Sequence, residues 1–265
     1  MVKERTKDLE EINRKLLMDL EYAREMQCSF LPSIMPTDIA LSFHSFYLPA
    51  ERLSGDFYNI IELDKNNIAI YIGDVAGHGV SAAMLTVFAH QNMKHLTESK
   101  SVKIISPPNH IMKNIYKSFN ETRFNEETYI VMLYGIYNIK NKRFTYSSAG
   151  INVPPLIVKK TGEIMELDTQ GHAIFKLGKF FSPIFENKVV QLEQGDKMLF
   201  YTDGLVEIET TSGDRYRNYF YKTIKENYFL KASDFSDTII KDFYDHIGDE
   251  KKLKDDVTFL LIEIQ

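Results

Sequence analysis

Apolar residues recur at three- and four-residue steps near the start of the chain, which predicts a long amphipathic helix. Residues 4–30 contain neither proline nor glycine and carry this stripe on Leu9, Ile12, Leu16, Ala23, Met26 and Phe30. Asp19 falls where a heptad repeat needs an apolar residue. A helix that packs partly on its own domain is therefore favoured over an uninterrupted coiled coil, and a homodimer through paired helices stays open.

Prolines mark the end of this helix. Leu31-Pro32 and Met35-Pro36 remove backbone donors and bias the preceding residues away from helix. We therefore expect an N-terminal helical segment over residues 1–36 and one globular domain over residues 37–265.

Beyond residue 36, short runs rich in β-branched and aromatic residues alternate with turn sequences, which predicts strands. The runs are residues 41–48, 57–63, 68–72, 129–137, 143–147, 155–158, 188–192, 197–201 and 257–264. Helical periodicity is found at residues 81–96, 109–124 and 233–246, and more weakly at 216–227. We expect an α+β fold in which helices pack outside antiparallel sheets.

Composition excludes several classes of protein. With 265 residues, 44% of them hydrophobic, the chain can bury a full core, and its net charge of −5 is interspersed rather than gathered into a basic face for nucleic acid. Cys28 is the single cysteine, so neither an intramolecular disulfide nor a cysteine zinc site is expected, which favours the cytoplasm. The longest apolar runs, residues 68–72 and 129–137, are too short to span a bilayer.

Four acidic turns carry the candidate chemistry. They are Ser54-Gly55-Asp56, Gly73-Asp74-Val75-Ala76-Gly77-His78-Gly79, Tyr201-Thr202-Asp203-Gly204 and Asp255-Asp256-Val257-Thr258. Each lies where a predicted strand begins or ends. Carboxylates on neighbouring strand ends can converge on a hard cation such as Mg²⁺ or Mn²⁺, while glycine lets the backbone pass close by. A single Asp-Gly pair is more often only a turn, so it is the set of four that predicts a metal site.

These motifs also carry a resemblance that covers roughly residues 20–264. Together with Leu48-Pro49-Ala50, Gly195-Asp196 and Leu205-Val206-Glu207, they occur in the order found in the protein phosphatase 2C (PPM) superfamily, and they resemble its bacterial SpoIIE/RsbU branch. The resemblance implies two packed antiparallel sheets flanked by helices, an αββα sandwich. It also implies a metal-dependent serine/threonine phosphoprotein phosphatase, in which two cations activate a water against the phosphate.

Carried over to this sequence, the resemblance implies that Asp56 and Asp74 hold or bridge two Mn²⁺ or Mg²⁺ ions. The Val75 carbonyl, Asp203 and Asp255 would complete the metal centre and, with the other aspartates, form the catalytic set. Asp256 is expected to support the site by hydrogen bonding rather than to bind metal.

Three further residues are candidates for supporting or substrate roles. Gly55 lies beside Asp56 in the first acidic turn. His78 is expected to stabilise its turn rather than bind metal, because hard cations prefer oxygen ligands. Arg52 could reach a substrate phosphate, although a solvated surface arginine is the favoured interpretation.

Two departures from the family pattern leave an alternative open. Ser54 stands where the family usually has a glycine, and Ile151 replaces the histidine of a Gly-His-Asn turn. A pseudophosphatase, which keeps the fold as a binding module without turnover, is the alternative that these departures support.

The resemblance further implies a phosphorylated protein substrate, expected to be a STAS-type anti-sigma-factor antagonist. It implies control by an upstream sensor domain or regulatory protein through the N-terminal helix. The chain would then be the cytoplasmic output end of a longer receptor. A second alternative is an adaptor whose functional part is the helix itself.

Overall fold

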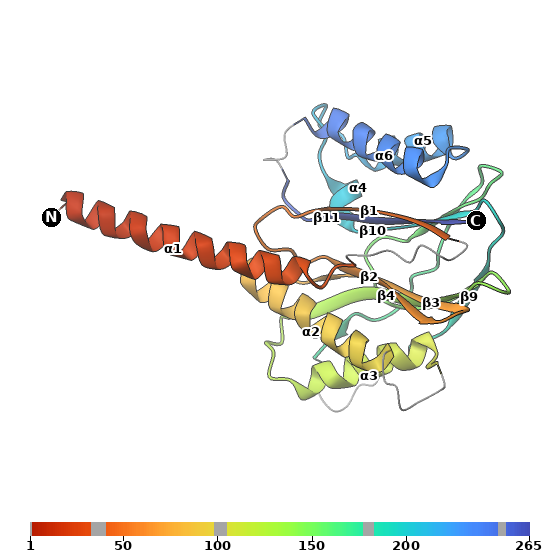
Figure 1. Ribbon diagram of the computed structural model, residues 1–265, viewed down its shortest axis with the longest axis horizontal. Helices are drawn as coiled ribbons and strands as arrows, with labels where there is room; N and C mark the ends of the chain where they lie inside the picture. The colour runs from red at the N-terminus through yellow and green to blue at the C-terminus, as the bar shows by residue number, and fades with distance from the viewer. Residues whose placement is uncertain (1, 33–40, 98–104, 177–182, 249–252) are drawn as a thin grey trace.

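The computed structural model describes residues 2–32, 41–97, 105–176, 183–248 and 253–265. Two antiparallel sheets lie face to face between two helical layers (Figure 1). One sheet has the order β1 (Leu41–Leu48), β11 (Val257–Ile264), β10 (Lys197–Tyr201), β6 (Leu156–Val158) and β7 (Ile164–Glu166). The other has the order β2 (Phe57–Asp64), β3 (Asn67–Val75), β4 (Tyr129–Asn138), β5 (Arg143–Ala149) and β9 (Lys188–Gln191), and β8 (Ile174–Phe175) pairs with β4.

The helical layers cover the outer faces of the sheets. Helices α2 (Gly79–Thr97) and α3 (Pro108–Glu121) lie against the β2–β9 sheet, and α5 (Arg217–Asn227) and α6 (Ala232–Ile247) lie against the β1–β7 sheet (Figure 1). A short helix, α4 (Asp203–Glu207), follows β10. The predicted αββα sandwich is confirmed.

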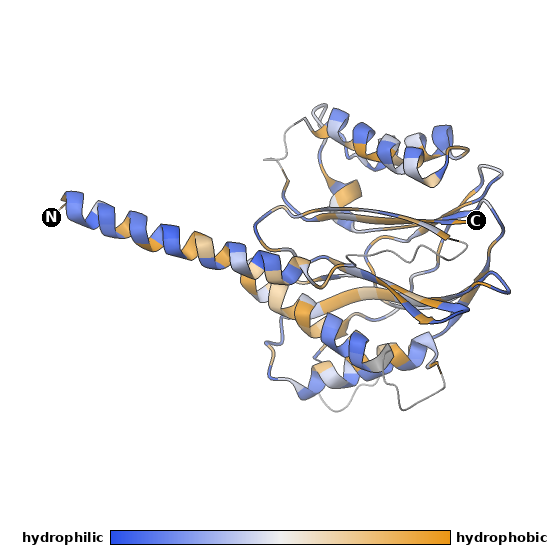
Figure 2. Ribbon diagram, in the orientation of Figure 1, coloured by the Kyte–Doolittle hydropathy of each residue, from blue (hydrophilic) through white to orange (hydrophobic). Residues whose placement is uncertain are grey.

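Side-chain alternation explains why both sheets are buried on both faces. In β3, Ile68, Ile70 and Ile72 face the core between the sheets, whereas Ala69 and Tyr71 face α2 and α3. In β11, Leu260, Ile262 and Ile264 face the first core, and Phe259 and Leu261 face α5 and α6. Because these strands are covered on both faces, their central residues are apolar, and the hydropathy colouring of Figure 2 shows hydrophobic stretches within both sheets.

The sequence missed three short elements, β7, β8 and α4, which have five residues or fewer and therefore too little periodicity to detect. The helix predicted to run to residue 124 ends at Glu121, because the Thr122 backbone N–H and hydroxyl both turn back to the Phe119 carbonyl. The predicted boundary near residue 36 lies outside the described residues.

Helix α1 (Val2–Cys28) projects from the sandwich and contacts it near its C-terminal end (Figure 1). Leu9, Ile12 and Leu16 are 71%, 65% and 55% exposed, so the apolar stripe is unpartnered along most of the helix. The expected packing of this helix on its own domain is thus restricted to its last turns. In the described part of the chain, no helix is both long and apolar enough to cross a membrane.

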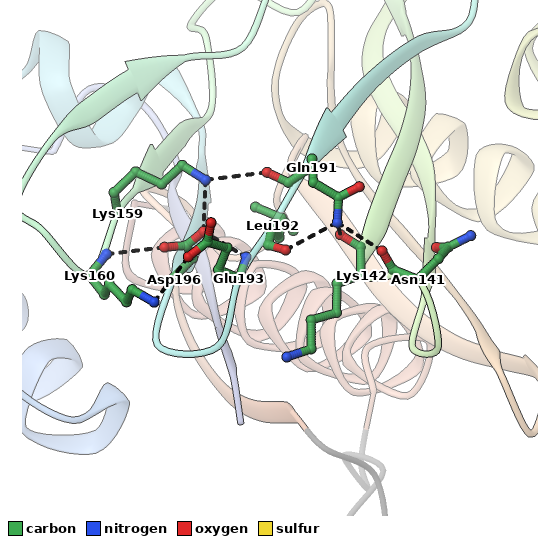
Figure 3. A network of polar contacts seen from close by, with 8 residues as sticks. All are labelled: Asn141, Lys142, Lys159, Lys160, Gln191, Leu192, Glu193 and Asp196. Atoms are coloured by element: carbon green, nitrogen blue, oxygen red, sulfur yellow. Dashed lines mark hydrogen bonds and ion pairs between the residues drawn. The ribbon is translucent and has the colours of Figure 1, made fainter.

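A buried aspartate anchors the loop between β9 and β10 to the β1–β7 sheet (Figure 3). Asp196 is 1% exposed and accepts hydrogen bonds from Lys159 Nζ (2.8 Å), the Lys160 backbone N–H (3.1 Å) and the Glu193 backbone N–H (2.8 Å). On the same loop, the Leu192 N–H donates to the Lys142 carbonyl at 2.9 Å. The β9–β10 loop is therefore fixed to both sheets.

We expect Asp196→Ala to lower the free energy of unfolding by about 3 kcal/mol, because the partly buried Lys159 ammonium and two N–H groups lose this acceptor. Glu193→Ala is the matched control. Its side chain pairs with Lys160 at 3.0 Å but is 65% exposed, so its loss should cost less than about 1 kcal/mol. Urea denaturation measures both variants, and equal effects would contradict this ranking.

Candidate metal centre

Each sheet brings two acidic strand ends together. Strands β2 and β3 are antiparallel, with Phe57 opposite Gly73, so Asp56 before β2 and Asp74 near the end of β3 lie at the same edge. Strands β10 and β11 are paired in the same way, with Tyr201 opposite Phe259. Asp203, which opens α4, and Asp255, just before β11, therefore lie at one edge of the second sheet.

Hydrogen bonds join these two edges. Thr202 Oγ1 donates to Asp56 Oδ2 at 2.8 Å and accepts from the Thr258 N–H at 3.1 Å. Asp256 accepts from the Ala50 N–H at 2.8 Å and from the Gly55 N–H at 2.6 Å. The four acidic turns thus meet at one end of the sandwich, as the predicted site requires.

Two glycines permit this close approach. A Cβ on Gly204 would lie 2.0 Å from the Asp256 carbonyl oxygen, a distance at which the backbone would have to move. A Cβ on Gly55 would lie 3.2 Å from Asp74 Oδ1 and 3.1 Å from the Val75 carbonyl oxygen. Glycine at these positions therefore serves close packing of the acidic turns rather than a positive φ angle.

The gathered negative charge shifts the titration of the site. Burial, then the charges of Asp74 and Asp256, raises the pKa of Asp56 well above its usual value. Burial, then the charges of Asp203, Asp255 and Asp256, raises the pKa of Asp74 to about 8. Burial and the neighbouring aspartates also raise the pKa of Asp255. These carboxylates repel one another, and a bound cation would relieve that repulsion.

The donor set fits a hard divalent cation. Carboxylate oxygens from four turns and the carbonyl oxygen of Val75, which faces Gly55, are the ligands that Mg²⁺ and Mn²⁺ prefer. Among the described residues, no group of three histidine, cysteine, aspartate or glutamate side chains has the close spacing of an occupied metal site. Carboxylates of like charge favour such separation until a cation lies between them.

A cleft of about 620 Å³ opens directly on this edge. Its lining includes Asp203, Gly204 and Asp255 of the acidic turns, together with Glu207, Glu209 and Lys254. Lys254 and Glu209 form an ion pair at 3.9 Å in this lining. Both side chains are more than two-thirds exposed, so the pair is weak. The acidic edge is thus accessible from solvent to a ligand larger than water.

Comparison with known proteins identifies the family. The family model described as Stage II sporulation protein E (SpoIIE) matches residues 64–265. The chain belongs to the SpoIIE family.

Individual relatives agree with this assignment. The chain is 27% identical over 253 residues to the phosphoserine phosphatase RsbU of Bacillus subtilis, a match that covers 95% of this chain and 71% of RsbU. It spans 41% and 58% of the length of two further curated relatives.

Among solved structures, the SiaA PP2C domain of Pseudomonas aeruginosa superposes with a TM-score of 0.80 at 19% identity, covering 96% of this chain and 99% of that one. RsbX, solved in complex with magnesium, superposes at 0.60 with 16% identity, covering 88% of this chain and 99% of that one. By family the chain is a SpoIIE-type domain, and its fold is the one seen in the PP2C domain of SiaA.

Other residues singled out in the sequence lie around the SpoIIE-family centre. His78 is 85% exposed, and its Nδ1 lies 3.4 Å from Glu51 Oε1. Arg52 donates to Glu21 of α1 at 3.1 Å. Both side chains thus have carboxylate partners outside the acidic set.

The two departures from the family pattern are also accounted for. Ser54 is fully buried, and its Oγ accepts from the Asp56 N–H at 3.0 Å, so the hydroxyl braces the first acidic turn. Ile151 is 6% exposed and packs in the core between the sheets. Neither side chain removes one of the expected ligands.

Sequence reasoning missed two polar residues that touch the aspartates. Thr202 binds Asp56, and Asn152 Nδ2 donates to Asp203 Oδ2 at 2.9 Å. Both belong to motifs visible in the sequence, but a hydroxyl or carboxamide in a turn has no spacing that reveals a partner 146 or 51 residues away.

The raised pKa of Asp74 predicts how the metal-free domain responds to pH. Between about pH 4 and pH 8 the folded carboxyl keeps a proton that the unfolded one, with a pKa of 3.8, releases. The free energy of unfolding should therefore fall as the pH rises through this window. Asp74→Asn should reduce that slope and raise stability at pH 8, as thermal melts in chelator would show. Equal slopes for the two proteins would contradict the charge cluster.

Proposed function

We propose that this domain hydrolyses phosphoserine or phosphothreonine in a protein substrate with two bound divalent cations, Mn²⁺ or Mg²⁺. The observation that carries the proposal is the meeting of Asp56, Asp74, Asp203 and Asp255 at the shared end of two sheets, beside an open cleft. The magnesium in RsbX supports a divalent metal in this fold.

The residues of this chain would divide the work as follows. Asp56, Asp74, Asp203, Asp255 and the Val75 carbonyl would hold the cations, which when bound supply an activated water and positive charge near the phosphoryl oxygens. Thr202 and Asn152 orient the carboxylates of Asp56 and Asp203. Asp256 fixes the backbone at Ala50 and Gly55. No side chain of the protein needs to act as a nucleophile.

The cleft sets the side from which a substrate would approach. A phosphorylated side chain would reach the acidic edge past Asp203 and Asp255, while the flanking polypeptide would lie along Glu207, Glu209 and Lys254. The relative RsbU is a phosphoserine phosphatase, which supports phosphoserine as the preferred group. A STAS-type anti-sigma-factor antagonist is our candidate for the phosphoprotein.

We further propose that residues 1–36 act as a regulatory segment for a domain formed by residues 37–265. The exposed stripe of Leu9, Ile12 and Leu16 supports this role, because such a surface is suited to an upstream sensor, a regulatory protein or a second copy of the chain. The contacts at the other end of α1 link any such partner to the Ser54–Asp56 turn.

We predict that Asp56→Asn and Asp203→Asn each reduce Mn²⁺-dependent hydrolysis of a phosphoserine peptide by at least about 100-fold, since each removes a charge that the reacting centre needs. The folded state should survive, because fewer like charges then repel. Asp237→Asn, on the exposed face of α6, is the matched control and should keep full activity.

Phosphate release with and without Mn²⁺, together with thermal melts, measures these effects. Normal turnover in both site variants would refute the assigned centre. A wild-type domain that binds Mn²⁺ without releasing phosphate from any phosphopeptide would instead support the pseudophosphatase.

A further inference from the structure

A buried carboxamide joins α1 to the acidic edge. Gln27 is 6% exposed and is the buried residue of a helix whose other described side chains are exposed or half-buried. Polar side chains are seldom the part of a helix that enters a core unless every polar atom finds a partner. The contacts of Gln27 therefore indicate its role.

Those contacts form a two-point clamp on the backbone of Ser54. Gln27 Nε2 donates to the Ser54 carbonyl oxygen at 2.6 Å, and the Ser54 N–H donates to Gln27 Oε1 at 3.1 Å. A neighbouring β-strand would normally form these two hydrogen bonds with its backbone. Here one side chain forms both. Ser54 is fully buried, so without Gln27 both of its backbone groups would lose a partner away from water.

The same amide also reaches the second acidic turn through α2. Gln27 Nε2 donates to Thr86 Oγ1 at 3.0 Å, and Thr86 in turn donates to the Ala83 carbonyl at 2.8 Å. Helix α2 begins at Gly79, directly after the turn that follows Asp74. One side chain thus connects the segment leading into Asp56 with the helix leading away from Asp74.

The clamp completes the support of the Ser54–Asp56 turn. On one side, the Gly55 N–H donates to the Asp256 carboxylate at 2.6 Å. Within the turn, the Asp56 N–H donates to the Ser54 hydroxyl oxygen. On the other side, the contacts just described come from Gln27. The turn is therefore held by Asp256, the residue before β11, and by Gln27 of α1.

We propose that Gln27 is a positioning residue of the phosphatase centre, which sets the place of the Asp56 turn relative to Asp74. The inference rests on the proposed function for its effect on catalysis, whereas its effect on the backbone is independent of activity. Small displacements of a reacting group can cost about 100-fold in rate, so losing the clamp should affect turnover more than substrate affinity.

The test compares Gln27→Met, which keeps the length of the side chain and removes its hydrogen bonds, with Asn13→Leu on the exposed part of α1. In Gln27→Met, kcat for a phosphoserine peptide with Mn²⁺ should fall about 10- to 100-fold with KM changed less than threefold. The Ser54 amide should exchange its hydrogen at least about tenfold faster in the metal-free protein. Asn13→Leu should match wild type in both.

Unchanged exchange at Ser54, or faster exchange with a wild-type kcat, would overturn the proposal. If the wild-type domain releases no phosphate, the proposed function fails, and the exchange measurement still decides whether Gln27 holds the turn. Should Gln27→Met prove too unstable for assay, Thr86→Val removes the bond to α2 and leaves the Ser54 pair. A three- to tenfold lower kcat is then expected, and a wild-type kcat would overturn the role.

Discussion

The structure depends on a conflict between electrostatics and backbone tethering. Aspartates from four distant segments repel one another, yet they are held at one end of the sandwich because hydrogen bonds to backbone and side-chain groups join their turns. The sheets supply the rigidity for this arrangement, since the strands that carry the turns are buried on both faces. In the metal-free state the carboxylates repel one another. A bound cation would relieve this repulsion, which would strengthen cation binding.

Much of this could be predicted from the sequence, for reasons that particular residues make clear. The apolar runs of β3 and β11 are long and bounded by turn residues, so strands were detectable there, and the sandwich followed from the family resemblance. The aspartates stood out because each lies at a strand end, and Asp56, Asp74 and Asp203 also lie beside a glycine. Their actual meeting could not be derived from spacing, because it depends on the pairing of β2 with β3 and of β10 with β11.

What the sequence concealed is the polar support of the site. Thr202, Asn152 and Gln27 act through hydrogen bonds to residues distant in the sequence, and none of them disturbs a hydrophobic period. Gln27 lies on a helix whose apolar stripe predicts that leucine and isoleucine, not glutamine, are the buried side chains. In the fold those apolar residues are exposed and the carboxamide is buried. The N-terminal part of α1 is therefore an exposed apolar surface, and its C-terminal end attaches the helix to the domain.

The account's central claim is that Asp56, Asp74, Asp203 and Asp255 hold two divalent cations. Anomalous diffraction from crystals of the domain grown with Mn²⁺ tests it most directly. We predict two strong anomalous peaks, each within about 2.5 Å of carboxylate oxygens from this set. Peaks confined to other surfaces, or none at saturating Mn²⁺, would contradict the account.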